Sequence, residues 1–175
     1  MSWEKVRLGD VVEFNPKIKL EKDLMYECIE MEHIKSGFKF AYPGKIKIGN
    51  SSGSKFQNGD TLFARITPCL ENGKIAEAKG LTNDVGIGST EFFVLRNIQN
   101  KTDKKFVFYL ALTDLIRGTA EKSMQGASGR QRAIKETVEN LYLKLPPLPT
   151  QKRIADILST YDNLIENNLQ RIKHL

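Results

Sequence analysis

Short apolar runs, each bounded by glycine, asparagine, aspartate or proline, follow one another along the first hundred residues. Such runs, rich in β-branched and aromatic residues and separated by turn-forming residues, are typical of β-strands. Their spacing favours a twisted, mostly antiparallel sheet over parallel strands joined by helices. We therefore predict strands over residues 11–14, 25–31, 45–48, 61–66, 74–78 and 91–95.

A helical period replaces this pattern after residue 103. Apolar positions then recur every three or four residues, which predicts a helix over residues 103–118 that ends at Gly118. A shorter helix is expected from residue 133 or 135 to residue 141, and the Gly/Ser-rich segment 126–129 between the two helices is expected to be a loop. The predicted fold class is therefore α+β.

The last part of the chain opens on a proline-rich break. Pro146, Pro147 and Pro149 fix φ and lack backbone donors, so no strand or helix runs through all three. Beyond them, apolar residues alternate at steps of about three and four, and Asn168 interrupts the seam as a polar member. The apolar members are Ile154, Leu158, Tyr161, Ile165, Ile172 and Leu175.

This seam predicts a coiled-coil-type helix that pairs with another helix. About 26 residues at about 1.5 Å each span roughly 40 Å, which is longer than a small domain needs. We therefore expect a single domain over residues 1–148 and a terminal helix over residues 149–175 that stands apart from it. The alternative is a C-terminal helix that packs on its own domain through the same seam.

Charge and composition bear on the kind of partner. The 175 residues carry a net charge of +6, and 40% are hydrophobic and 27% charged, which is ordinary for a globular protein. Residues 149–175 hold about one unit of that charge, so about five units lie on residues 1–148, where a polyanion would dock. A basic balance alone supports a nucleic-acid partner only weakly, because many solvated surfaces are basic.

The sequence lacks the residues that several kinds of site require. Two cysteines without CxxC spacing and two histidines indicate neither a disulfide framework nor a metal site, and we expect reduced cysteines in a cytoplasmic protein. No apolar run approaches about 20 residues, so no membrane span is expected. Glu77 and Lys79 match half of a nuclease motif, a match expected by chance, and two histidines support no credible Ser/His/Asp set. We expect no catalytic residue.

Two loops are candidates for contact with nucleic acid. In residues 126–135, glycines let the backbone approach a phosphate and Ser128 can donate to its oxygens. Arg130 and Arg132 alternate, so both can point from one face of an extended segment, and Gln131 has the amide geometry that reads adenine. The alternative is a flexible surface loop with incidental arginines.

The second candidate loop, residues 65–74, follows a predicted strand. Thr67-Pro68 and Asn72-Gly73 would build a rigid loop that could enter a groove of DNA, with Arg65, Asn72 and Lys74 as its tips. The alternative is an ordinary hairpin in which Asn-Gly is simply the turn.

The proline break and its flanks resemble a known family. The segment Leu145-Pro-Pro-Leu-Pro-Thr-Gln-Lys-Arg-Ile154 is similar to the junction between a target-recognition domain and a conserved spacer helix in specificity (S) subunits of type I restriction-modification enzymes. Residues 3–10 resemble the start of such domains, and residues 59–66 and 89–95 resemble their interior strands. With one domain, one helix and no internal repeat, the chain resembles a half-length S subunit.

The resemblance implies a non-catalytic function in DNA recognition. The body would bind double-stranded DNA, and family recognition domains often carry a Gly/Ser-rich loop with a Gln or Arg before the last short helix. A methyltransferase (M) subunit would bind S-adenosylmethionine and methylate adenine, and a restriction (R) subunit would add translocation and cleavage. No cofactor is therefore expected on this chain.

The resemblance also implies interfaces on the terminal helix. Two half-length chains would pair through their helices as a homodimer, and a two-fold symmetric dimer would recognise a palindromic bipartite target. The M subunit would dock on the helix and the adjoining domain, with the proline turn, Lys152, Arg153 and Asp156 as contacts. The predicted residues of the dimer or M-subunit interface are Gln151, Arg153, Ile154, Leu158, Tyr161, Ile165, Asn168 and Ile172.

Two other interpretations remain open. The chain could be a recombination cassette truncated from a longer subunit and inactive until it is joined to another domain. It could also be a decoy or regulator that binds M subunits without contacting DNA.

Overall fold

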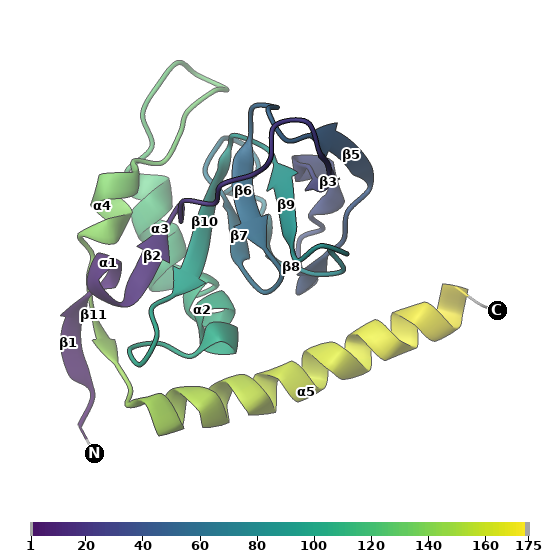
Figure 1. Cartoon of the computed structure of the whole chain (residues 1–175). Helices are drawn as coiled ribbons and strands as arrows, with labels where there is room; N and C mark the ends of the chain where they lie inside the picture. Colours follow the sequence, from purple (N-terminus) through teal and green to yellow (C-terminus); the bar gives the residue numbers. More distant parts are fainter. Residues whose placement is uncertain (1, 174–175) are drawn as a thin grey trace.

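A five-stranded sheet forms the middle of the body and is covered on both faces (Figure 1). The computed structural model describes residues 2–173, apart from the side chain of Lys173. The order of this sheet is β2-β10-β7-β8-β4. Its strands are β2 (Val12–Phe14), β4 (Phe40–Ala41), β7 (Thr61–Ala64), β8 (Ile75–Ala78) and β10 (Phe92–Asn97).

A four-stranded sheet with the order β5-β3-β9-β6 lies against one of these faces. Its strands are β3 (Met25–Ile29), β5 (Lys45–Ile48), β6 (Ser54–Gln57) and β9 (Val85–Gly88). A separate two-stranded sheet pairs β1 (Glu4–Arg7) with β11 (Tyr142–Leu145). The first strand of the chain therefore lies beside the strand that leads into the last helix. The helices are α1 (Leu8–Val11), the 3-10 turn η1 (Met31–His33), α2 (Lys104–Ala111), α3 (Asp114–Lys122), α4 (Lys135–Glu139) and α5 (Leu148–Lys173).

Two apolar cores lie on the two faces of the five-stranded sheet. Successive side chains of a strand point to opposite faces. Phe63 and Phe93 therefore join the core beneath the helices, whereas Leu62 and Val94 join the core beneath the four-stranded sheet. Burial on both sides explains why β7 and the first part of β10 are continuous apolar runs rather than alternating ones.

All six predicted strands are present, as β2, β3, β5, β7, β8 and β10. They are divided between two sheets rather than one, and the pairings β3·β9 and β4·β8 are parallel. β9 was not predicted because two of its four residues are glycines. A Cβ on Gly86 would lie 2.9 Å from the Glu27 carbonyl oxygen, and one on Gly88 would lie 2.4 Å from that of Ile29. Glycine is therefore what lets β9 approach β3 this closely.

The prediction of one helix over residues 103–118 is wrong, because the structure has two helices there, α2 and α3. The Thr113 hydroxyl donates to the Leu110 carbonyl at 2.7 Å, and the backbone of Thr113 is extended, so the chain turns before α3 begins. Gly118 lies inside α3 and ends no helix. The shorter helix is confirmed as α4, and the segment 126–129 lies between α3 and α4 as predicted.

The long terminal helix is confirmed, but it does not stand apart from the body. α5 has 26 residues and begins at Leu148, so Pro149 lies in its first turn, where a missing backbone donor is tolerated. The helix runs along the side of the body and packs against α2 (Figure 1). The face turned toward the body is small and polar, and Gln151, Ala155 and Ser159 are buried there.

A second face of α5, beside the face that meets the body, is apolar and exposed. Its large hydrophobic residues are Ile157, Leu158, Tyr161, Leu164, Ile165 and Ile172. Asn168 is exposed, whereas Ile154 is half-buried against the core beneath the helices. Most of the predicted seam therefore faces outward, and the body takes the polar face of the helix instead. The last seam residue, Leu175, lies outside the described residues.

Gln151 was predicted to lie at an interface, yet the structure buries it, with 1% of its surface exposed. Its Oε1 accepts a hydrogen bond from the Asp103 backbone at 2.9 Å. Its Nε2 donates to the carbonyls of Lys101 at 3.1 Å and Pro146 at 2.8 Å. One amide thus joins the loop before α2, the proline break and the first turns of α5, so Gln151 anchors the helix to its own body.

We expect Gln151→Ala to lower the free energy of unfolding by about 3 kcal/mol, because it leaves one donor and two acceptors of the backbone buried without partners. Urea unfolding followed by circular dichroism measures the change. Gln170→Ala is the matched control: its amide donates only to Glu166 on the exposed surface of the same helix, so we expect a change within about 0.5 kcal/mol. Equal changes in the two variants would contradict the anchoring role of Gln151.

Candidate nucleic-acid interface

The two predicted DNA-contact loops lie side by side in the structure. The Thr67 backbone donates to the Gln131 carbonyl at 3.0 Å, and the Ala133 backbone donates to the Arg65 carbonyl at 2.7 Å. A short antiparallel bridge continues this pairing at Arg132. These bonds hold the chain that follows β7 against the segment between α3 and α4, so side chains from both loops share one surface.

Glu91, just before β10, receives an arginine from each loop. Arg132 Nε donates to the two carboxylate oxygens at 3.0 and 2.9 Å, and its Nη2 donates to Oε1 at 2.7 Å. Arg65 Nε donates to Oε2 at 3.3 Å, and its guanidinium lies 5.6 Å from the centre of the Phe93 ring. Two cations share one anion, so the group keeps a net positive charge at the surface.

The protonation of this group follows from its contacts. The hydrogen bond from Arg132 holds the pKa of Glu91 below its ordinary value, against the opposing effect of partial burial. The same contact raises the pKa of Arg132. The carboxylate is therefore ionised at neutral pH and orients both guanidinium groups.

The rest of the first loop forms an exposed tip. Gly126 and Gly129 have positive φ angles of 125° and 78°, conformations that side chains rarely adopt. The segment between α3 and α4 projects from the body at the end away from α5 (Figure 1). Ser128 and Arg130 are exposed on it, and Gln131 is half-buried where the tip meets the body.

The second loop contributes less than the sequence predicted. Asn72 is exposed in the turn. Lys74 is half-buried, and its Nζ donates to the Met31 carbonyl at 2.9 Å, which ties this side chain to η1. The structure therefore brings Arg65 to the first loop, exposes Asn72 and directs Lys74 toward the body.

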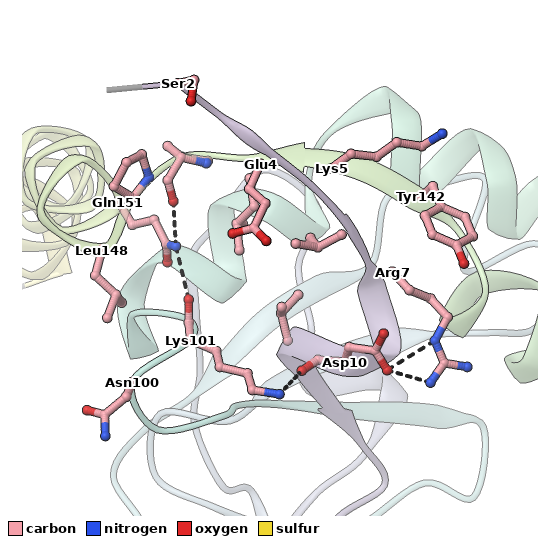
Figure 2. Close-up of a pocket in the computed structure, with 15 residues that line it drawn as sticks. Ser2, Glu4, Lys5, Arg7, Asp10, Asn100, Lys101, Tyr142, Leu148 and Gln151 are labelled. Carbon is pink, nitrogen blue, oxygen red and sulfur yellow. Dashed lines mark hydrogen bonds and ion pairs between the residues drawn. The ribbon is translucent and has the colours of Figure 1, made fainter.

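A groove of about 630 Å³ lies at the other end of the molecule, at the base of α5 (Figure 2). The β1–β11 sheet, the loop before α2 and the proline break form its walls. Arg7 Nε donates to Asp10 at 3.1 Å, and Lys101 Nζ donates to the Asp10 carbonyl at 2.8 Å. Figure 2 shows these contacts together with Gln151, which closes the groove on the helix side.

Within residues 2–173, no group of three or more His, Cys, Asp or Glu side chains is placed to hold a metal ion. In the same part of the chain, no helix combines the length and the apolar character needed to cross a bilayer.

A family model described as "Type I restriction modification DNA specificity domain" matches residues 1–175. The chain belongs to this family. The type I restriction enzyme EcoAI specificity subunit of Escherichia coli is 31% identical over 175 residues, which cover 95% of this chain and 30% of that protein. The putative type I restriction enzyme MjaX specificity subunit of Methanocaldococcus jannaschii is 30% identical over 172 residues, which cover 93% and 40% of the two chains.

Solved structures share the fold. The HsdS subunit from Thermoanaerobacter tengcongensis superposes with a TM-score of 0.71 at 22% identity, over 99% of this chain and 45% of that one. A chain from a study of complex assembly and conformational transition in the type I R-M system gives a TM-score of 0.72 at 21% identity, with the same coverage. The α+β class with a long C-terminal helix and the family resemblance are thereby confirmed. The chain spans 30% to 45% of the length of these four proteins.

Glu91 is a residue of the candidate site that the sequence did not reveal. The segment 89–95 was recognised as a strand, and no local pattern pairs a single glutamate with two arginines distant in sequence. The pairing depends on the register of β10 against β7, which places Phe92 opposite Ala64 and so sets Glu91 beside Arg65.

We expect Glu91→Gln to lower the free energy of unfolding at neutral pH and to have little effect in acid. A depressed folded-state pKa means that the stabilisation is fully present above the unfolded value of about 4.3 and is lost as the pH falls through the folded value. Urea unfolding of both proteins from about pH 7 to about pH 3 measures the difference. Glu71→Gln, in the exposed turn, is the control, and its free energy of unfolding should stay close to that of wild type throughout this range. A difference that persisted in acid would mean that Glu91 stabilises by packing.

Proposed function

We propose that this chain recognises a DNA sequence for a type I restriction-modification complex and has no catalytic role of its own. Membership of the family of DNA specificity domains supports the proposal. The observation that carries it is the meeting of two arginine-bearing loops at the end of the body away from α5. Each loop alone could be a surface turn, whereas together they make a cationic surface that is pre-organised.

In this proposal the surface contacts DNA in two ways. The carboxylate of Glu91 accepts hydrogen bonds from the guanidinium groups of Arg65 and Arg132. The oxygens of a DNA phosphate can replace this carboxylate as the acceptor, because they accept the same kind of hydrogen bond from arginine. Ser128 and Arg130 extend farther on the exposed tip and would contact the backbone. Amide side chains can read adenine, so Gln131 and Asn72 are the proposed base-reading residues, with Lys74 contributing charge.

Reversing the charges of Arg130 and Arg132 together is expected to abolish most duplex binding and to flatten its salt dependence. Each lost phosphate contact lowers the slope of log K against log salt by about 0.9, so two contacts lower it by about 1.8. Fluorescence anisotropy with a random-sequence duplex, at several salt concentrations, measures both quantities. Lys5→Glu with Lys144→Glu makes the same charge change on the β1–β11 sheet. If both double variants lose equal affinity, only net charge matters and the loop is not the DNA interface.

We further propose that two copies pair through the exposed face of α5. Six large apolar side chains lie on this face, and exposing such a continuous stripe in water is unfavourable. Leu158, Tyr161 and Ile165 have the three- and four-residue spacing of a helix-pairing seam, and Asn168 sits where a polar residue sets register. A symmetric pair of chains would then hold two recognition surfaces at a fixed separation.

Leu158→Lys with Ile165→Lys is expected to convert the dimer to a monomer while the body stays folded. Buried lysines in a helix pair lack partners, which disfavours association. Sedimentation equilibrium at micromolar concentration reports the mass. Thr160→Lys with Asn167→Lys adds the same charges to exposed positions of α5 outside the apolar stripe and should leave the dimer intact. A wild-type chain that sediments as a monomer would overturn the homodimer proposal.

The M subunit is the proposed enzymatic partner, and it would carry the S-adenosylmethionine. Its proposed docking region is the base of α5, where the groove meets exposed Lys152, Arg153 and Asp156. An R subunit would join the same complex. A chain that binds M subunits but not duplex would instead be a decoy, and a monomer that becomes active only when fused to a second domain would be a truncated cassette.

A further inference from the structure

The contact between α5 and the body contains a buried lysine. Lys39, just before β4, is 6% exposed, and its Nζ donates to the Tyr109 hydroxyl at 3.0 Å and to Ser159 Oγ at 3.1 Å. The Glu77 carboxylate lies 3.7 Å from the same nitrogen. One ammonium group therefore connects the five-stranded sheet, helix α2 and the middle of α5.

Aromatic rings complete the surroundings of this ammonium. Nζ lies 4.7 Å from the centre of the Tyr109 ring, 5.4 Å from that of Phe40 and 5.5 Å from that of Phe108. Burial lowers the pKa of Lys39 and raises that of Glu77. A buried charge is tolerated only when it is paired and hydrogen-bonded. Here the body supplies the carboxylate of Glu77 and the hydroxyl of Tyr109, and α5 supplies the remaining hydrogen-bond acceptor, Ser159 Oγ.

Two further contacts continue the same polar line along α5. The Tyr109 hydroxyl donates to the carboxylate of Asp162, one turn beyond Ser159. The Tyr42 hydroxyl donates to Glu166 at 3.0 Å, one turn farther. With the Gln151 anchor at its start, α5 is held by directional hydrogen bonds over about four turns.

Directional bonds restrict a helix in a way that an apolar contact does not. An apolar surface can slide or tilt and lose little, whereas a buried polar network is satisfied in few geometries and is unfavourable when half-satisfied. Bonds of this directional kind join α5 to the body in the group formed by Lys39, Glu77, Tyr109, Ser159 and Asp162, which we term the polar latch.

We infer that Lys39 and Tyr109 are positioning residues that fix the angle of α5 and thereby set which spacer between two half-sites the paired chains accept. This inference rests on the proposed function, because it needs DNA recognition and pairing through α5. The geometry makes spacing sensitive to the angle. A tilt of about 5° moves the far end of a helix about 39 Å long by about 3.4 Å, which is one base-pair step.

The first test measures spacer preference. Methylation mapping identifies the half-sites, and duplexes then carry them with spacers up to two base pairs shorter or longer. We expect wild type to prefer one spacer over its neighbours by about tenfold, and Tyr109→Phe or Lys39→Met with Glu77→Gln to reduce this preference below about threefold. The preference for bases within each half-site should not change, which separates positioning from damage to the DNA surface.

Lys105→Met is the matched control. Lys105 and Asp156 form an exposed ion pair at 3.0 Å that joins the same two helices as the polar latch. Exposed pairs contribute little to rigidity or stability, so this variant should keep the wild-type spacer preference. The double variant removes Glu77 together with Lys39 so that no buried carboxylate loses its partner. If it fails to fold, Tyr109→Phe still decides, because it removes only one hydroxyl group.

A second readout needs no DNA. Spin labels at Glu136→Cys on α4 and Asn167→Cys on α5, both exposed positions, report the distance between the body and the helix in a Cys69→Ser background. We expect a narrow distance distribution in wild type and a broad one in the latch variants. Latch variants that keep a narrow distribution and a sharp spacer preference would overturn the inference. A wild-type chain that binds no DNA would overturn the proposed function, while the distances would still decide whether the latch fixes the helix.

Discussion

The polar contact between α5 and the body is the constraint on which the arrangement of the molecule depends. Gln151 and Ser159 are buried against backbone and side-chain partners that lie far away in sequence. Because the body takes the polar side of the helix, the apolar side is left in solvent. An amphipathic surface helix ordinarily turns its apolar stripe toward its own core. The reversed orientation leaves an apolar stripe of α5 exposed, which is the surface that a partner helix would need.

The fold could be predicted where burial imposes a local pattern. Five of the six predicted strands alternate or are continuously apolar because their side chains meet one or two cores, whereas β5 is mostly exposed. Prediction failed where tertiary contacts overrode local preference. β9 is a strand because its glycines permit close approach to β3, and Thr113 divides a continuous apolar period by bonding back to Leu110. Neither effect can be seen in the spacing of apolar residues, because each depends on a contact with the backbone of another residue.

The candidate site shows the same limit. The loops could be chosen from their glycines, arginines and amides, but their adjacency follows from the hydrogen bonds of Arg65 and Thr67 to the segment after α3. Gln151 was assigned to an interface because the segment around it resembles the junction with a pairing helix in the family. It is buried because its amide bonds to the backbone N–H of Asp103 and to the carbonyls of Lys101 and Pro146. No sequence pattern indicates that these three groups meet at one side chain.

Pairing inside the structure also changes what the net charge means. The guanidinium of Arg96 and the ammonium of Lys39 are matched by Asp60 and Glu77 within the body, so they add little field outside it. Arg65 and Arg132 share one carboxylate at the surface, which leaves one positive charge uncompensated there. A polyanion responds to such a local excess of positive charge rather than to the net charge of the chain, because at physiological salt screening limits the field of a charge to about 8 Å. In the proposed function, this uneven pairing, more than the sum of +6, is what would direct a duplex to the loops.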